Sequence, residues 1–179
     1  KPVITGFDEA AVAASDIGRL LAAAGVTPTS EYISLVSPWR FAAPLSPDMA
    51  AAREGSSVPV DEVIAYCRAA IAEAEQADMS LAIEGIGGVM VPLDGTRTVA
   101  DVIAALGIPA ILVGGSYLGS LSHTLTAYEA LRVRDVEIDR VIISETPDSE
   151  VPLAETRDVL ARFVAPVTVE VMPFVPNGL

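Results

Sequence analysis

The sequence predicts an α/β fold with three layers, α/β/α, built around a mostly parallel sheet. Short aliphatic runs typical of strands alternate with longer segments whose apolar residues recur at helical spacing. Hydrophobic residues make up 51% of the chain and aromatic residues only 5%, which favours small-residue helices packed on an aliphatic sheet. Strands that are apolar throughout indicate a sheet covered on both faces. The 179 residues show no repeat or linker, so we expect one α/β domain over 1–179.

The first half of the chain starts with the end of a strand and a loop. Ser15 is a suitable N-cap for a helix that Gly25 ends. Ser46-Pro47 is a typical start for a short alanine-rich helix. A longer helix carries an apolar stripe that includes Cys67, so we expect this cysteine in the core. The remaining predicted elements here are strands over 33–37 and 81–83, with the long helix over 60–74.

The second half continues the alternation. We predict helices over 98–106, 118–134 and 153–163, and strands over 108–113, 141–143 and 167–171. In sheets of this kind ligands bind beyond the carboxyl ends of the strands, where the strand order reverses. The loops over 1–6, 84–88, 114–120 and 144–147 are therefore the places to look for a site.

Charge and cysteine content exclude several functions. The formal net charge is −13 and the pI about 4.3, which argues against binding nucleic acid or an anionic membrane surface. No apolar run reaches the roughly 18 residues that a membrane span needs. A single cysteine forms no internal disulfide, which fits the cytoplasm, and one cysteine with one histidine cannot complete a structural zinc site.

The first residue is the only lysine, because ten of the eleven basic residues are arginines. Chance in a lysine-poor composition is one explanation for Lys1. The other is a need for a compact, mobile cation that contacts phosphate or carboxylate oxygens, a role that a planar guanidinium does not fill.

Two acidic residues stand at positions suited to a cation site. Glu84 follows an apolar run and precedes three glycines in four residues, whose backbone can approach a ligand closely. Such an acid commonly holds Mg²⁺ together with phosphate oxygens and water, although it could simply mark the exit of a strand into solvent. Asp16 lies in the first turn of a predicted helix, where the helix dipole alone would favour it.

Two further segments have open interpretations. Residues 39–47 combine the single tryptophan, an arginine and two prolines, which suits either a ligand pocket or a packed surface turn. Residues 118–124 open a helix directly after a glycine-rich strand end, where free N–H groups attract an anion. His123 in that segment could be a general base, a ligand or a capping partner, and a structural role is the simplest, since no neighbouring acid or nucleophile completes a triad.

Five segments together resemble the ATP-dependent dethiobiotin synthetases in order and approximate spacing. They are KPVITG at 1–6, SD at 15–16, FAAPLSP at 41–47, EGIGGVMVPL at 84–93 and LGSLSHTL at 118–125. The resemblance extends over nearly the whole chain. It implies a P-loop NTPase-like fold, a cytoplasmic homodimer, and closure of the ureido ring of dethiobiotin from 7,8-diaminononanoate, carbon dioxide and ATP with Mg²⁺.

The resemblance also implies roles for individual residues. Lys1 corresponds to the lysine that stabilises the carbamate and the transferring phosphate, and Thr5 to a residue near the carbamate. Asp16 and Glu84 correspond to carboxylates that bind magnesium, and Gly87 to a place where the backbone approaches the substrate. The remaining positions are Ser46 and Pro47, which line the substrate; Gly119, Ser120 and Ser122, which reach its carboxylate across the dimer interface; and Ser144, Pro173 and Phe174, which are candidates for contact with the nucleotide base.

The sequence departs from the family pattern in three places. The strand, phosphate loop and helix that the family places before the Lys-Pro segment are not among these residues, so we expect a single domain that lacks them. Ser122 stands where many members carry asparagine, and 144–147 replaces an asparagine-containing segment that usually meets adenine. A non-catalytic paralogue, or a related amidoligase or partitioning-type ATPase, is the alternative interpretation.

Overall fold

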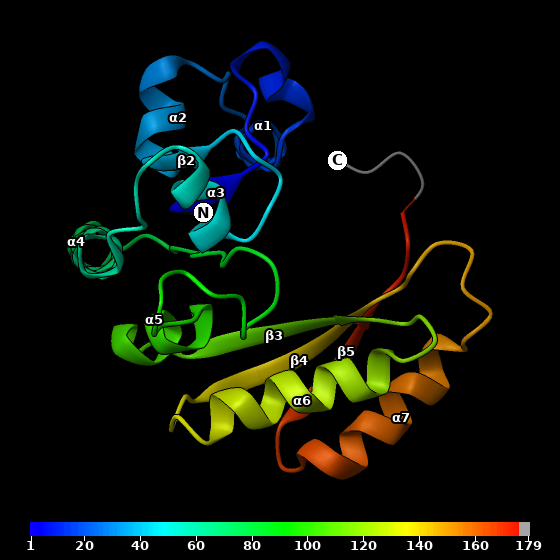
Figure 1. Ribbon diagram of the computed structural model, residues 1–179. Coiled ribbons are helices and arrows are strands. Elements are labelled where there is room, and N and C mark those ends of the chain that lie inside the picture. Colours follow the sequence, from blue (N-terminus) through cyan, green and yellow to red (C-terminus); the bar gives the residue numbers. More distant parts are fainter. Residues whose placement is uncertain (176–179) are drawn as a thin grey trace. The chain divides into compact units, whose positions relative to one another are not determined.

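The computed structural model describes residues 1–175, which form an α/β protein (Figure 1). The chain divides into two compact units, Lys1–Val102 and a second that begins at Ile103. The strands pair into two parallel sheets, β1-β2 in the first unit and β3-β4-β5 in the second. The predicted α/β class with parallel pairing is therefore confirmed. Within 1–175 no helix has both the length and the apolar character needed to cross a bilayer.

The first unit is organised around a short parallel pair. Strand β1, Val3–Thr5, lies beside β2, Trp39–Phe41, with Ile4 opposite Arg40. Helix α1, Asp16–Ala23, begins at the predicted cap: the Ser15 hydroxyl accepts a hydrogen bond from the Gly18 amide at 3.2 Å. Its buried Ile17 and Leu21 pack with Ile4 in a small core. A 3-10 segment, η1, Glu9–Ala14, precedes α1.

Two helices of the first unit follow the predicted pattern. Helix α3, Pro47–Arg53, starts with proline at its first turn, and α4, Val60–Gln76, buries one stripe of residues. Cys67 lies on that stripe and is 2% exposed, as predicted. Burial raises the pKa of its thiol, so the group stays protonated and chemically quiet at neutral pH.

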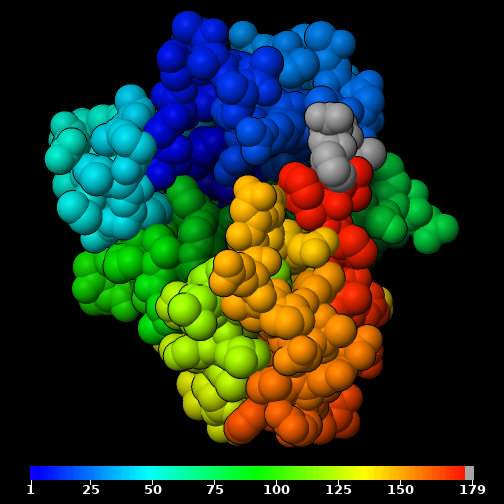
Figure 2. All heavy atoms as spheres, turned by 90° about the vertical axis from the view of Figure 1, so that its right-hand side faces the viewer, coloured from blue at the N-terminus to red at the C-terminus, as the bar shows by residue number. Residues whose placement is uncertain are grey.

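The second unit is a three-stranded sheet with helices on one face. Strands β3, Ala110–Gly115, β4, Ile138–Ser144, and β5, Thr168–Met172, lie in that order. Helix α6, Ser120–Arg132, packs on β3, and α7, Leu153–Val164, packs on β5. The two helices lie side by side, which Figure 2 shows as adjoining yellow-green and orange atoms. Helix α5, Val99–Leu106, spans the division between the units.

Three local predictions in the first unit were wrong. The run over 33–37 lies mostly in helix α2, Ser30–Val36, because Thr29 caps it by accepting a hydrogen bond from the Tyr32 amide at 3.2 Å. Residues 81–83 belong to no strand, since no neighbouring strand pairs with them. Residues 39–41, expected in a pocket-lining segment or a surface turn, form β2 because β1 offers a parallel partner.

Candidate functional site

Lys1, Asp16 and Glu84 meet in the first unit although they are far apart in sequence. The Lys1 Nζ atom lies 2.5 Å from Asp16 Oδ2 and 2.7 Å from Glu84 Oε1. The Lys1 side chain is only 6% exposed, whereas the two carboxylates are 52% and 54% exposed. One ammonium group is thus enclosed beneath two acids whose remaining oxygens are open to solvent.

Two members of this cluster, Lys1 and Asp16, are placed by their own local structure. Lys1 lies two residues before the start of β1, and its carbonyl accepts a hydrogen bond from the hydroxyl of the fully buried Ser37. The Trp39 amide extends the parallel pairing by donating to the Pro2 carbonyl at 3.2 Å. Asp16 is the first residue of α1 and is therefore held at the end of a capped helix. This support fixes the backbone of both residues.

Charge balance keeps the lysine protonated. Burial favours the neutral amine, but hydrogen bonds to Asp16 and Glu84 and the attraction of their charges outweigh it, so the pKa of Lys1 lies above its ordinary value. The ammonium group therefore remains a cation across the physiological range. A permanent cation with two open carboxylates suits a reaction that builds negative charge on oxygen.

The carboxylates of Asp16 and Glu84 also fit a magnesium ion. Mg²⁺ needs only one or two protein carboxylates when phosphate oxygens and water complete its shell. Both acids keep about half of their side-chain surface exposed and so have oxygens to offer. Within residues 1–175 no group of three or more His, Cys, Asp or Glu side chains is arranged to hold a metal, so an all-protein cage is not available there.

The glycine-rich segment after Glu84 packs closely against Val91 in the following turn and Val99 at the start of α5. A Cβ atom at Gly85 would lie 2.8 Å from Val99 Cγ1, and one at Gly87 would lie 3.0 Å from Val91 Cγ2. Gly87 also has φ +66°, a left-handed conformation that glycine adopts without strain. The absence of side chains at these positions lets the segment that follows Glu84 pack against Val91 and Val99.

The other predicted residues of the first unit lie on neighbouring elements. Thr5 is the last residue of β1 and is half-buried. The Ser46 hydroxyl donates to Asp48 Oδ1 at 2.5 Å, and Pro47 is buried at the start of α3. Gly6, directly after Thr5, has its amide bonded to the Ala43 carbonyl at 3.1 Å, so the end of β1 and the 41–47 segment are in contact.

In the second unit the loop between β3 and α6 carries another group of predicted residues. Gly119 has φ +97° and serves as the N-cap of α6 without a side-chain cap. Ser120 is 1% exposed, and its hydroxyl has no hydrogen-bond partner in the described structure. Ser122 is exposed in the first turn of α6. The start of α6 therefore places an orphan buried hydroxyl at a helix N-terminus, the end of a helix that attracts anions.

The residues predicted near the nucleotide base also gather in the second unit. Ser144 ends β4, opposite Met172 of β5, and Pro173 and Phe174 follow that strand. The Phe174 amide donates to Glu145 Oε2 at 2.8 Å, which ties the segment after β5 to the loop after β4. All three predicted residues therefore lie at the carboxyl ends of adjacent strands.

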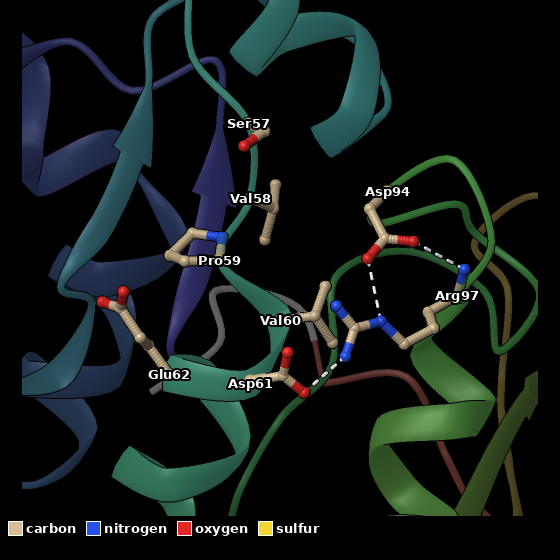
Figure 3. A pocket seen from close by; sticks show the side chains of 8 residues that line it. All are labelled: Ser57, Val58, Pro59, Val60, Asp61, Glu62, Asp94 and Arg97. Atoms are coloured by element: carbon tan, nitrogen blue, oxygen red, sulfur yellow. Dashed lines mark hydrogen bonds and ion pairs between the residues drawn. The ribbon is translucent and has the colours of Figure 1, made fainter.

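One polar cavity of the first unit contains none of the predicted residues. It has a volume of about 310 Å³ and is bordered by Ser57, Val58, Pro59, Val60, Asp61, Glu62, Asp94 and Arg97. Arg97 bridges Asp61 at 2.6 Å and Asp94 at 2.8 Å, while Glu62 points away from it (Figure 3). Asp94 also accepts bonds from the amides of Thr96 and Arg97. Sequence reasoning missed this bracing network, although Asp94-Gly95 is a turn signal.

Comparison with known proteins agrees with the fold. A family model described as an AAA domain matches residues 1–177. An ATP-dependent dethiobiotin synthetase of Acidiphilium cryptum is 48% identical over 163 residues, which cover 90% of this chain and 72% of that protein. The proteins of the same name from Methylobacterium nodulans and Phenylobacterium zucineum are 43% identical, covering 90% and 97% of this chain and 73% and 74% of their own.

The chain is thus an α/β protein of the three-layer, P-loop NTPase-like class, with parallel strands and a carboxylate-ammonium cluster close to the start of one of them. Within that class it belongs to the ATP-dependent dethiobiotin synthetase family. The resemblance inferred from the five sequence segments is confirmed.

Proposed function

We propose that this protein closes the ureido ring of dethiobiotin from 7,8-diaminononanoate and carbon dioxide, using ATP and Mg²⁺, as a step of biotin synthesis. The observation that carries the proposal is the cluster of Lys1, Asp16 and Glu84 in a chain of this family. The reaction is a ligation that forms carbon–nitrogen bonds. Its difficult steps all place charge on carbamate or phosphate oxygens, and these need a cation held in place.

In the proposed reaction one substrate amine adds to carbon dioxide and loses a proton, giving a carbamate. A carbamate oxygen then attacks the γ-phosphorus of ATP and ADP leaves, so a mixed carbamic-phosphoric anhydride forms. The second amine attacks the carbamate carbon, inorganic phosphate leaves, and the ring closes with loss of another proton. No covalent bond to the protein is needed at any step.

Lys1 is proposed to contact the carbamate and the transferring phosphate, with Thr5 close to the carbamate. The Lys1 ammonium is enclosed and permanently charged, so it can neutralise developing negative charge without reorganisation of water. Asp16 and Glu84 would hold the magnesium ion, which when bound neutralises phosphate charge. With a metal ion on these acids, the Lys1 ammonium would be available to contact the substrate oxygens.

The substrate and nucleotide contacts are proposed by position. Ser46, Pro47 and Gly87 would line the diamine end, and Gly119, Ser120 and Ser122, at the start of α6, would reach the carboxylate end from across the dimer interface. Ser144, Pro173 and Phe174 are proposed to contact the nucleotide base. The family relationship also supports a homodimer that places substrate near its interface, and the cytoplasm as its compartment.

The test is a steady-state assay on protein expressed from its complete reading frame. ADP release should require both the diamine and bicarbonate, and the product should have the mass of dethiobiotin. Chelation of Mg²⁺ by EDTA should abolish it, and added Mg²⁺ should restore it. ATP turnover that ignores the diamine would overturn the proposal and favour a different ligase or ATPase of the same class.

A further inference from the structure

The loop that opens α6 contains an interaction that the proposed reaction does not use. The Tyr117 hydroxyl and His123 Nδ1 lie 2.8 Å apart and form a hydrogen bond. Their ring centroids are 5.7 Å apart at 49°. Tyr117 precedes and His123 follows Gly119, Ser120 and Ser122, so their hydrogen bond joins the two sides of the turn that would receive the substrate's carboxylate.

The Tyr117 ring packs against a glycine, Gly115, at the end of β3. A Cβ atom at Gly115 would lie 2.8 Å from the Cδ1 and Cε1 atoms of the Tyr117 ring. The ring therefore rests directly on the backbone at Gly115, and from there its hydroxyl reaches His123. An alanine at position 115 would push the ring away from this position.

The start of the loop is held from the other side by a buried serine. Ser116 is fully buried; its amide donates to Thr146 Oγ1 at 3.1 Å, and its hydroxyl accepts from the Thr146 amide at 2.9 Å. Its carbonyl accepts a hydrogen bond from Ser149 at 2.7 Å. The loop is thus anchored at Ser116, and the next fixed point along the chain is the contact between Tyr117 and His123.

Backbone bonds transmit this contact to the helix start. The Ser120 amide donates to the Tyr117 carbonyl at 2.9 Å, and the His123 amide donates to the Gly119 carbonyl at 3.2 Å. Both side chains of the pair are therefore attached to residues whose backbone forms the turn. Gly119, with φ +97°, has no side-chain cap to stabilise that turn, so the side-chain pair supplies the missing restraint.

From this geometry we infer that Tyr117 and His123 are positioning residues that hold the Gly119 turn in the conformation that binds the substrate's carboxylate. The inference rests on the proposed function. Preorganising a binding turn lowers the entropy lost on binding, so its effect falls on affinity for the carboxylate-bearing substrate. This positioning role does not require either ring to contact the reacting amines.

The test measures diamine binding by calorimetry, without turnover, for the protein and four variants. Tyr117→Phe and His123→Ala should each weaken binding of 7,8-diaminononanoate about three- to ten-fold. His123→Asn should retain most of the affinity, because its amide group lies near the position of Nδ1. The combined Tyr117→Phe and His123→Ala change should weaken binding no further than either alone, because both remove the same contact.

Two controls separate positioning from general damage. A diamine of equal length without the carboxylate should bind equally to the protein and to every variant. Tyr32→Phe, which removes an exposed tyrosine hydroxyl from α2 in the first unit, should change nothing. Tyr117 is 39% exposed and His123 is exposed, so these variants should keep the thermal unfolding midpoint of the parent.

A spectroscopic readout is available because the sequence contains one histidine. Its imidazole ¹⁵N signals belong to His123 without assignment, and Tyr117→Phe should shift the Nδ1 signal. Unchanged affinity for the diamine in both single variants, or equal losses for both diamines, would overturn the inference. Failure of the unmodified protein to bind the diamine at all would overturn the proposed function and this inference with it.

Discussion

The side chain of Lys1 is almost fully enclosed, while the two carboxylates that it contacts remain about half exposed. This difference in exposure lets a stability measurement distinguish a catalytic role of Lys1 from a structural role. Exposed carboxylates are hydrated and screened, so losing their partner costs the fold little. An enclosed ammonium that loses both partners has no such compensation.

At the residue scale, we therefore expect the two sides of the cluster to differ in how much their substitution changes the free energy of unfolding. Lys1→Met should change the free energy of unfolding by less than about 1 kcal/mol. The combined Asp16→Asn and Glu84→Gln change should lower it by about 1–3 kcal/mol, since it leaves a buried charge without a countercharge. Urea unfolding at pH 7 measures both. A larger loss for Lys1→Met than for the double variant would contradict the account.

A second residue-scale prediction concerns Asp94. Hydrogen bonds from Thr96 and Arg97 lower the pKa of this carboxyl from 3.8 to about 2. The unfolded chain therefore binds the proton more readily, and the stabilisation is complete above about pH 4 and is lost as pH falls toward 2. Asp94→Asn should cost on the order of 1–2 kcal/mol at pH 7 and much less near pH 2.5.

Urea titrations at both pH values measure the Asp94 effect. Asp61→Asn is the matched control, because Asp61 pairs with the same Arg97 but is 87% exposed. Its effect should be below about 0.5 kcal/mol at either pH. Equal effects of Asp94→Asn at pH 7 and pH 2.5 would show that the lowered pKa does not stabilise the fold.

At the element scale, the start of α1 depends on a close backbone approach. A Cβ atom at Gly18 would lie 2.1 Å from the Val12 carbonyl oxygen and 2.9 Å from Ala13 Cα, both in η1. Alanine gains about 1 kcal/mol over glycine in a helix. An overlap with backbone cannot be relieved by a side-chain rotation, so the clash outweighs that gain.

We predict that Gly18→Ala lowers the free energy of unfolding by about 1–3 kcal/mol. It should also reduce activity, because it displaces the helix that carries Asp16. Gly95→Ala is the control: nothing lies within 4 Å of a Cβ at that position, and the effect should be within about 0.5 kcal/mol. Similar effects of the two substitutions in chemical denaturation would refute the close approach.

The elements also show what the sequence could and could not predict. Helices with capping residues or a clear apolar stripe, such as α1, α3 and α4, were predicted because those signals are local. The short apolar run over 33–37 was assigned to a strand because periodicity cannot distinguish helix from strand over five residues. Strand β2 and the unpaired 81–83 depend on whether a partner strand is adjacent, which the local sequence does not encode.

The site divides in the same way. Lys1, Asp16 and Glu84 were predicted from the single lysine and from two acids at the ends of expected elements, and the structure brings the three side chains together although the strand expected before Glu84 is absent. The Tyr117–His123 contact and the Arg97 network were not predicted. A turn brings Tyr117 and His123, six residues apart, into contact. Another turn brings Arg97 to Asp94, three residues away, and Arg97 also reaches Asp61 on helix α4.

At the scale of the whole molecule, a homodimer is expected. Sedimentation velocity should show a species of twice 18.6 kDa for this chain, and dilution below the dissociation constant of the dimer should weaken diamine binding in parallel. The reason is that the proposed carboxylate site draws on residues from across the interface. A monomer that binds the diamine with undiminished affinity would exclude a shared site.

The central claim is that the enclosed ammonium of Lys1 acts on the transferring phosphate. The most direct measurement is rapid-quench, single-turnover formation of ADP by the protein and by Lys1→Arg, with and without diamine and bicarbonate. The account predicts fast ADP formation only when both substrates are present, and a rate at least about 100-fold lower in Lys1→Arg with diamine binding retained. An unchanged single-turnover rate in Lys1→Arg would contradict it.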